Sequence, residues 1–335
     1  MASIDELSPR QPINHLAPET DARLQDLMSA NLGSIFPAAA LCAVFRGDVV
    51  LNSAWGWLDP DERRYPVQTD TLFDLASVTK LFTVTAFLSL VSAGKALVDD
   101  PIVTVLPEFG RITPRPMDGG QDPHSKVDLP TPDELVGKTI DPACITFRHL
   151  LAHTSGLAPW RDVYNAAGSA PTPPDVPEPV SRAERWSKAL SVLWDYPFVG
   201  EPGKTVHYSD LGLMLLGEAV SRLHGAPGAL NAAIADRVTA PLGLSTVTFN
   251  PVQNGIKREY IAPTEYDAMW RQRRVWGEVH DENACGVGGV AGHAGLFAAA
   301  RDVAALGQAW LAEDERLKIT PDLLREARQE QTNGE

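Results

Sequence analysis

The sequence predicts an α+β fold in which helices dominate and one antiparallel sheet grows from an N-terminal hairpin. Two apolar runs, 38–45 and 49–57, flank Arg46-Gly47-Asp48, a triplet that suits a hairpin turn. Apolar segments with helical periodicity dominate the rest of the chain. Hydrophobic residues make up 44% of the 335 residues and charged residues 21%, a balance that allows a sizeable core in one large domain or two lobes.

The elements are expected in the order helix, hairpin, long buried helix and then mainly helices. The first helix spans 18–31, and Pro18 suits its first position because a missing N–H costs nothing there. The long helix begins near Ser77 and ends at Gly94. Two exposed, proline-rich loops are expected at 110–137 and 170–179. Later helical segments are predicted at 98–107, 145–151, 183–193, 210–223, 230–238, 302–311 and after Thr320-Pro321.

The charge and the cysteines restrict the partners and the compartment. A formal net charge of −14 argues against binding to nucleic acid or to an anionic membrane. No apolar stretch reaches membrane-spanning length, and the N-terminus lacks the basic head and apolar run of a secretory signal. Cys42, Cys144 and Cys285 are widely spaced and odd in number, which favours free thiols in a reducing compartment. We therefore expect a cytoplasmic protein.

Two groups of residues suggest a metal site, but only weakly. His149 and His153 are four apart on a predicted helix, yet position 150 is Leu where a zinc protease carries its catalytic Glu. His293 and the segment 280–282 could gather round an ion, although nothing in the sequence fixes their geometry. We expect no metal and no cofactor.

The strongest chemical signal is Ser77, followed three residues later by Lys80. At this spacing both side chains lie on one helix face, and Ser77 falls where the helix begins. The free N–H groups of a helix start stabilise negative charge that develops beside the serine. No other charge occurs before Lys95, and a buried lysine that is partly neutral can take the proton of a serine hydroxyl. The S-x-x-K pattern by itself is common, and a capping serine with a surface lysine would also explain it.

The order of several motifs adds to this signal. The stretches 77–80 (Ser-Val-Thr-Lys) and 208–210 (Tyr-Ser-Asp) resemble the serine β-lactamase and penicillin-binding-protein superfamily, in particular its class C-like serine hydrolase branch. Further stretches that resemble this branch, in order, are 97–101, 150–157, 202–203, 241–244 and 289–297. The resemblance implies a single β-lactamase-like domain over 1–335. Its helical lobe would span about 81–240, and its α/β lobe, with an antiparallel sheet, about 15–76 and 241–335.

The resemblance also implies acyl transfer without a cofactor. Ser77 would attack a carbonyl to form an acyl-enzyme, Lys80 would assist its deprotonation, and Tyr208 would relay the proton to the leaving group. The backbone N–H of Ser77 would donate to the oxyanion, an effect worth roughly 3 kcal/mol in other enzymes. The candidate substrate-binding residues are Asp210, His293 and Gly295. The expected partner is a small-molecule or peptide-like acyl substrate, and the sequence leaves the oligomeric state open.

Two departures from the family pattern narrow these expectations. Position 210 is Asp where the family commonly has Asn, and a carboxylate cannot donate to a substrate amide, which favours an ester or peptide over a β-lactam. The family also carries a Lys/His-x-Gly triplet on a strand. His293-Ala294-Gly295 fits it, but it follows Tyr208 by only 85 residues (293 − 208), and no strand pattern is visible after it. We expect a separate glycine-rich loop here, with the third element and its strands beyond Glu335; the alternative is that His293 is the motif residue.

Two functions from different classes stay open at this point. The first is a serine hydrolase that acts on an ester, amide or β-lactam. The alternative is a catalytically impaired, truncated or degenerate homologue with a binding or regulatory role, since missing strands would leave a sheet edge exposed to another chain.

Overall fold

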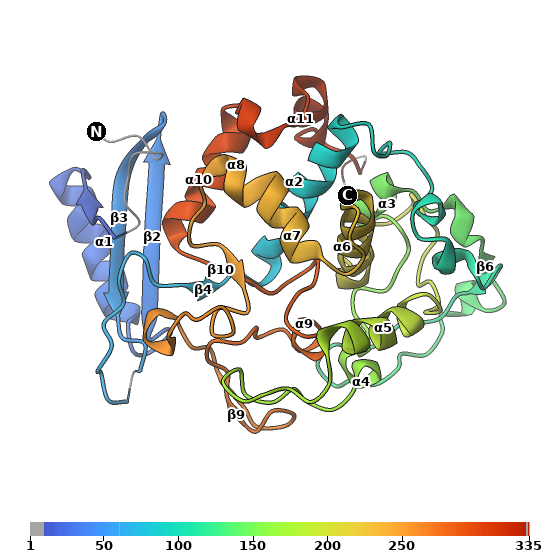
Figure 1. Ribbon diagram of the computed structural model, residues 1–335, viewed down its shortest axis with the longest axis horizontal. Helices are drawn as coiled ribbons and strands as arrows, with labels where there is room; N and C mark the ends of the chain where they lie inside the picture. The colour runs from blue at the N-terminus through green and yellow to red at the C-terminus, as the bar shows by residue number, and fades with distance from the viewer. Residues whose placement is uncertain (1–9, 60, 333, 335) are drawn as a thin grey trace.

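A three-stranded antiparallel sheet built on the predicted hairpin lies at one end of the molecule (Figure 1). The computed structural model describes residues 10–59, 61–332 and 334. In this sheet β2 (Ala38–Phe45) pairs with β3 (Asp48–Gly56), and β1 (Ile13–Asn14) pairs with the other edge of β3. Arg46 and Gly47 have φ values of 54° and 88°. Because two successive positive φ angles define the turn whose twist matches that of the strands, the hairpin forms where the sequence predicts it.

Helices lie on the two sides of this sheet. α1 (Pro18–Asn31), which forms with the predicted bounds, is joined to β3 by a hydrogen bond of 2.9 Å from the Trp55 indole to the Gln25 side chain. α10 (Ala300–Leu311) contacts β2, and Figure 1 shows it on the side of the sheet opposite α1. The Leu27 side chain of α1 is 60% exposed, so this helix covers the sheet without being buried itself.

A second antiparallel sheet joins three distant parts of the chain. Its strands are β4 (Phe73–Asp74), β10 (Leu296–Ala298) and β7 (Thr248–Phe249), with β10 in the centre. Two sequence-based predictions are therefore wrong: the chain forms more than one sheet, and a strand does follow His293-Ala294-Gly295. β10 lacks the expected alternation because all three of its residues are buried. The two remaining strand pairs are β5 (Arg115–Pro116) with β6 (Thr139–Ile140), and β8 (Tyr266–Asp267) with β9 (Arg273–Arg274).

Two apolar helices pack together at the centre of the helical part. α2 (Thr79–Ser92) and α6 (Asp210–His224) contact each other, and α6 is buried from Leu211 to Ser221. A helix that is apolar on every side belongs in a core, and α2 buries both Phe82 and Phe87 completely. Among the described residues, no helix combines the length and apolarity needed to cross a membrane.

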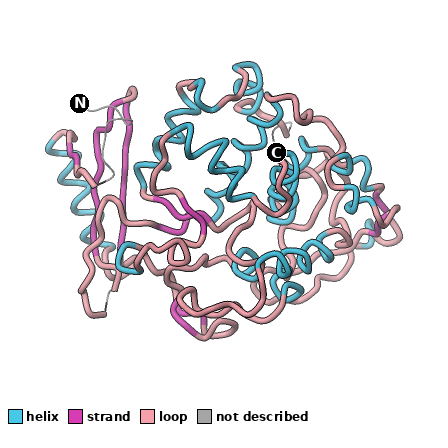
Figure 2. The backbone as a smooth tube through the Cα atoms, in the orientation of Figure 1, coloured by secondary structure: helices cyan, strands magenta, loops and turns pink. Residues whose placement is uncertain are grey.

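The other helices are short and are connected by long loops, which Figure 2 shows along the lower and right-hand parts of the molecule. They are α3 (Phe147–Leu151), α4 (Val163–Ala167), α5 (Arg182–Leu193), α7 (Leu230–Ile234), α8 (Ala240–Leu242), α9 (Glu282–Gly286) and α11 (Pro321–Ala327). A π-helical stretch, Ala235–Thr239, joins α7 to α8, so Pro241 lies inside a helical segment and not beyond its end as predicted.

The stretch 110–137 is mostly loop, but it is not wholly on the surface as predicted. The Arg115 side chain is fully buried, with its guanidinium carbon 4.2 Å from the centre of the Phe109 ring and 5.2 Å from that of Phe198. Two aromatic faces therefore stabilise a cation that the surroundings would otherwise exclude. The predicted two-lobed division of the chain is not tested by these contacts and stays a prediction.

Candidate active site

A strained turn presents Ser77 at the start of α2. Ser77 lies in a single 3₁₀ turn, Ala76–Val78, directly after β4, and Ala76 has a φ of +44°. This left-handed conformation costs an L-residue about 1–2 kcal/mol. The Asp74 carboxylate holds the turn, because it accepts the Ala76 N–H at 2.8 Å and the His280 N–H at 2.6 Å. The result is an exposed Ser77 directly before a buried helix.

Lys80 lies one turn further along and is 6% exposed. Its Nζ is 2.8 Å from Ser77 Oγ, 2.7 Å from Asp210 Oδ1 and 3.2 Å from the main-chain oxygen of His293. The nitrogen therefore donates hydrogen bonds to Ser77 Oγ and to the His293 oxygen and forms an ion pair with Asp210. The centre of the Tyr208 ring lies 4.8 Å from the same nitrogen. The amine therefore connects the serine to two segments that are remote in sequence.

Close packing of glycines brings the His293 carbonyl to Lys80. A Cβ on Gly217 of α6 would lie 2.9 Å from the Cα of Gly292, so only glycine allows the two main chains to approach this closely. From the other side, the Thr83 hydroxyl of α2 donates to the Gly292 carbonyl at 2.8 Å. The segment is thus clamped between the two central helices, one residue before the carbonyl that Lys80 contacts.

The His293 side chain forms a buried pair with Asp281. The His293 Nε2 atom is 2.8 Å from Asp281 Oδ1, and the imidazole is 1% exposed. Burial lowers the pKa of His293, but the charge of Asp281 and the hydrogen bond to it outweigh burial, so the pKa is raised. Burial likewise opposes ionisation of Asp281, yet the His293 charge lowers the pKa of this carboxyl to about 2. Each side chain therefore favours the charged form of the other beside Lys80.

Tyr208 lies directly before α6, and its side chain is half exposed. Ser209 is the N-cap of the helix, since its hydroxyl accepts the Gly212 N–H at 3.1 Å. The Tyr208 ring stacks on the ring of His153, with centroids 4.5 Å apart. Burial, followed by the positive charge of Lys80, lowers the pKa of His153 to about 4. This histidine is therefore neutral at physiological pH.

The structure brings some of the predicted site residues together more closely than others. Ser77, Lys80 and Asp210 form one contact network, and Tyr208 lies over it. His293 reaches Lys80 through its main chain, while its side chain turns to Asp281. No contact between Gly295 and these groups is observed; it has a φ of +116°, and a Cβ there would lie 2.5 Å from the Gly289 oxygen. Substrate binding by Asp210, His293 and Gly295 stays a prediction.

Two residues of the site have roles that the sequence did not reveal. His153 was expected to end a helix, and Asp281 was considered only as a member of a doubtful metal-binding group. A weak signal exists for each: His153 precedes Gly156 at a helix end, and Asp281 precedes a short helix whose Ala284 N–H it caps at 2.7 Å. Neither signal identifies the remote residue that each side chain contacts, because that contact depends on tertiary packing.

Among the described residues, one group has the proximity of metal ligands. The ligand atoms of Asp210, Asp281 and His293 lie within 4.8 Å of one another. The positive Lys80 amine contacts Asp210, and His293 Nε2 faces Asp281. These ligand atoms already have cationic or hydrogen-bonding partners, so the donor set does not favour a further cation.

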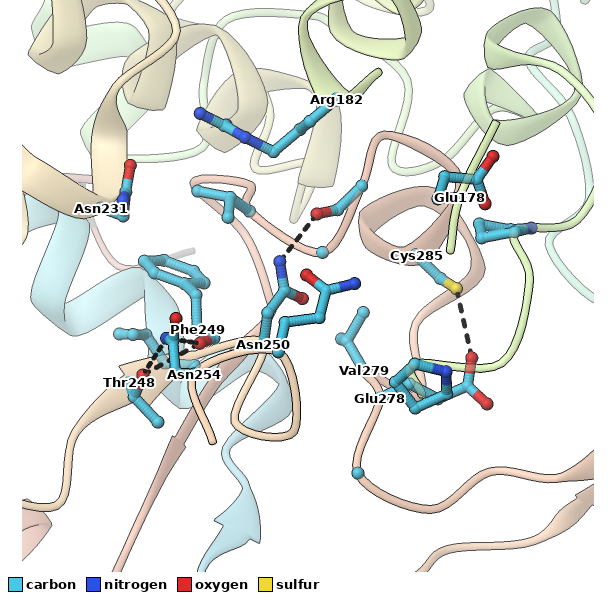
Figure 3. Close-up of a pocket in the computed structure, with 18 of the residues that line it drawn as sticks. Glu178, Arg182, Asn231, Thr248, Phe249, Asn250, Asn254, Glu278, Val279 and Cys285 are labelled. Carbon is cyan, nitrogen blue, oxygen red and sulfur yellow. Dashed lines mark hydrogen bonds between the residues drawn. The ribbon is translucent and has the colours of Figure 1, made fainter. Parts of the chain in front are cut away.

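The structure also contains a cavity that neither Ser77 nor Lys80 lines. It has a volume of about 550 Å³ and is lined by residues from α5, α7, β7 and the segment 277–290 (Figure 3). Two of its charged lining residues, Arg185 and Glu178, pair with each other at 2.9 Å, and a third, Glu278, pairs with Arg273 outside the lining at 2.7 Å. Chemistry therefore points to the network at Lys80, not to this cavity.

An α+β fold with a serine and a lysine one turn apart at the start of a buried central helix defines the β-lactamase-like class of proteins. The chain belongs to the Beta-lactamase family, which matches residues 24–335. It is 30% identical, over 298 residues, to a putative D-alanyl-D-alanine carboxypeptidase of Escherichia coli (strain K12), covering 82% of this chain and 60% of the relative. It is 31% identical, over 309 residues, to an N-acetylmuramyl-L-alanine amidase of Bacillus subtilis (strain 168), covering 86% and 62%.

A solved structure supports the same fold. A class C β-lactamase from Rhodobacter sphaeroides superposes with a TM-score of 0.59 at 18% identity, covering 93% of this chain and 69% of that one. The predicted β-lactamase/transpeptidase-like α+β fold is therefore confirmed. The chain spans about three fifths of the length of the curated relatives, at 60% and 62%.

Proposed function

We propose that this protein is a serine hydrolase that acts through an acyl-enzyme formed on Ser77. The observation that carries the proposal is the 2.8 Å contact between Ser77 Oγ and Lys80 Nζ. A hydroxyl is a weak nucleophile unless a base within hydrogen-bond reach takes its proton, and Lys80 is placed to do so. Family membership and the two curated relatives, both named as hydrolases of amide bonds, support the reaction class.

Acylation requires Lys80 in its unprotonated form. As Ser77 Oγ bonds to the acyl carbon, its proton moves to Lys80 Nζ, and the carbonyl oxygen becomes an oxyanion. The N–H of Ser77, at the start of a helix, is the proposed donor to that oxyanion. Asp210 and the His293 carbonyl stabilise the ammonium that forms, since Asp210 forms an ion pair with Nζ at 2.7 Å and the His293 carbonyl accepts a hydrogen bond from it.

Tyr208 is the proposed relay to the leaving group. Its ring lies over the Lys80 amine, and a nearby cation favours a polarised phenol. The phenol protonates the leaving group as the bond to the acyl carbon breaks, and the proton that Lys80 took from Ser77 passes to the phenolate oxygen, which restores both residues. Water then adds to the acyl carbon and its proton is transferred to Ser77 Oγ as the serine leaves, so that the free enzyme is restored and the acid product departs.

The proposed substrate is an ester or a peptide-like amide. The E. coli relative is named as a carboxypeptidase and the B. subtilis relative as an amidase, which supports a peptide-like acyl group. Asp210 supports the same class, because an ionised carboxylate held at 2.7 Å from Lys80 cannot donate to a β-lactam amide. Hydrolysis of a β-lactam is the less favoured reaction.

Covalent labelling tests the nucleophile. A fluorescent fluorophosphonate and a fluorescent penicillin should label the protein, and Ser77→Ala should abolish labelling. Ser89→Ala is the matched control, since Ser89 lies on the same helix with its hydroxyl buried and without a hydrogen-bond partner. Equal labelling of the Ser77→Ala variant would remove Ser77 from the mechanism.

Turnover of p-nitrophenyl acetate and of a chromogenic cephalosporin separates the hydrolase from the regulatory alternative. Rates that depend on Ser77 support the hydrolase. A folded protein without any Ser77-dependent turnover would support a binding role instead.

We also propose the cytoplasm as the compartment. Cys42, Cys144 and Cys285 are all free, and Cys285 is buried, where its thiol has its pKa raised to about 12 and is unreactive. Fractionation of cells that produce the protein tests this expectation.

A further inference from the structure

His153 holds the chain on both sides of Tyr208. Its main-chain oxygen accepts the N–H of His207 at 2.8 Å, and its Nδ1 accepts the N–H of Ser209 at 3.0 Å. Its ring stacks on the Tyr208 ring, with centroids 4.5 Å apart and an interplanar angle of 36°. One residue therefore touches Tyr208 and both of its neighbours.

The backbone of His153 is strained in a way that enables this contact. Its φ is +57°, a left-handed conformation that residues other than glycine adopt rarely. The chain turns there directly after α3, and both the carbonyl and the imidazole of His153 meet the segment that precedes α6. Such strain persists only where the surroundings enforce it, and it gathers at functional sites.

Two further hydrogen bonds continue this attachment toward α6. The Ser209 hydroxyl donates to the Ala158 carbonyl at 2.7 Å, and the Asp210 N–H donates to the Pro159 carbonyl at 2.9 Å. The start of α6 is thus fixed along the segment 153–159. Tyr208 itself is 52% exposed, so the stack on His153 restrains a ring that water would otherwise leave free to move.

The hydrogen bond to Ser209 also fixes the tautomer of His153. A ring nitrogen that accepts an N–H carries no proton, so the proton of the neutral imidazole is on Nε2. The charged groups that face this ring are Lys80 of α2, which lowers its pKa, and Asp210 of α6, which raises it. Burial and Lys80 prevail, and the neutral acceptor persists.

We propose that His153 is a positioning residue that keeps the Tyr208 ring over the Lys80 amine. It does so by stacking on this ring and by binding the residues on either side of it. The inference rests on the proposed function, in which Tyr208 relays a proton. It extends that function because His153 then acts through Tyr208 and not on the substrate.

A double-mutant cycle tests this dependence. In His153→Asn the amide oxygen can replace Nδ1 as acceptor and asparagine tolerates the left-handed φ, but the stack is lost. We expect it to lower kcat for p-nitrophenyl acetate about tenfold with little change in KM. In the Tyr208→Phe background the same substitution should have no further effect. An equal loss of kcat in both backgrounds would overturn the proposal.

His149→Asn is the matched control. His149 lies four residues earlier and its Nδ1 also accepts a backbone N–H, from Thr146 at 3.2 Å, but in the described part of the chain its ring does not stack on Tyr208. We expect this variant to retain wild-type kcat. A tenfold loss in His149→Asn as well would show that any substitution in the segment slows the enzyme, and would overturn the specific role.

A third variant separates the effect of the stack on Tyr208 from that of the hydrogen bond with Ser209. His153→Phe keeps a ring beside Tyr208 but leaves the Ser209 N–H without its acceptor. Recovery of kcat relative to His153→Ala shows that the stack contributes to positioning. If His153→Phe is no faster than His153→Ala while its thermal unfolding and Ser77 labelling are those of the wild type, the stack has no such role.

Nuclear magnetic resonance gives a readout that does not depend on turnover. Long-range ¹H–¹⁵N spectra of histidine-labelled protein should show His153 neutral at pH 7, with its proton on Nε2. Protonation of Nδ1 would overturn the proposal. A different result would contradict the proposed function: Ser77→Ala would then retain turnover, whatever the protonation state of His153.

Discussion

Two histidines flank Lys80, and their pKa values are shifted in opposite directions. His153, next to Tyr208, is neutral because its pKa is lowered to about 4, whereas His293 on the opposite segment has its pKa raised. The same two charges act on both rings in the same direction: Lys80 lowers each pKa and Asp210 raises each. Burial lowers both as well. The charges of Lys80 and Asp210, together with burial, therefore do not explain why the two pKa values shift in opposite directions.

The direct partner of each ring does explain it. His293 faces the Asp281 carboxylate, which favours the charged imidazole. His153 faces the N–H of Ser209, a donor that requires an unprotonated nitrogen. For these two buried histidines, the nearest hydrogen-bonding group decides the direction in which the pKa shifts. The neutral ring can stack on a phenol, and the charged one can be part of an ion pair.

Removal of the shared charge should have the largest effect. Lys80→Met is expected to lower kcat/KM for p-nitrophenyl acetate about 10³-fold, because the proposed base is lost. It should also raise the pKa of both histidines, since Lys80 lowers each. Steady-state kinetics and a histidine titration by nuclear magnetic resonance measure the two effects. A rise at one ring only would contradict the view that both feel the same field.

Breaking the charged pair should destabilise the fold. Asp281→Asn leaves His293 without its carboxylate and should lower the free energy of unfolding by about 3 kcal/mol. This value is at the lower end of the destabilisation known for broken buried ion pairs, because the Asp281 side chain is 26% exposed. Urea unfolding measures the loss. Glu184→Gln, which breaks the exposed pair with Lys188, is the control and should cost about 0.5 kcal/mol or less.

Asp210→Asn should shift both histidines in the same direction, with a smaller kinetic effect. Asp210 raises the pKa of His153 and of His293, so the variant should lower both values. Activity on an ester is expected to fall about tenfold, because one acceptor for the Lys80 ammonium is weakened. Hydrolysis of a cephalosporin should fall less or rise, since the new amide can donate. A larger loss with the cephalosporin than with the ester would contradict this reading of position 210.

The pH dependence of stability should separate the two histidines. Between pH 6.5 and 4 unfolded His153 binds more protons than the folded form, so its contribution to stability falls as the pH falls through this range. His293 behaves in the opposite way, because its stabilisation is present below about pH 6.5 and is lost as the pH rises through its raised pKa. His153→Asn should flatten the acid side of the urea-unfolding profile and His293→Gln the alkaline side. Unchanged profiles in both variants would refute the assigned charge states.

Local patterns predicted much of the fold correctly. The helix over 18–31 and the hairpin around Arg46 form as expected, because a proline at a helix start and a turn with positive φ leave a clear trace in the sequence. β10 was missed, since three fully buried residues have no alternation to detect. The helix over 230–238 was predicted to end too early, because the sequence gives no sign that a π-helical stretch, Ala235–Thr239, carries the helical chain on into α8, which contains Pro241.

The sequence by itself determined that Ser77 and Lys80 lie on one face at the start of a buried helix, because three residues make about one helical turn. Only the tertiary structure decided which groups surround the lysine. The His293 carbonyl comes from 213 residues away and the Asp210 carboxylate from a different helix. A local repeat fixes spacing along a helix, whereas contacts between remote segments depend on packing such as that of Gly217 against Gly292, which no local pattern encodes.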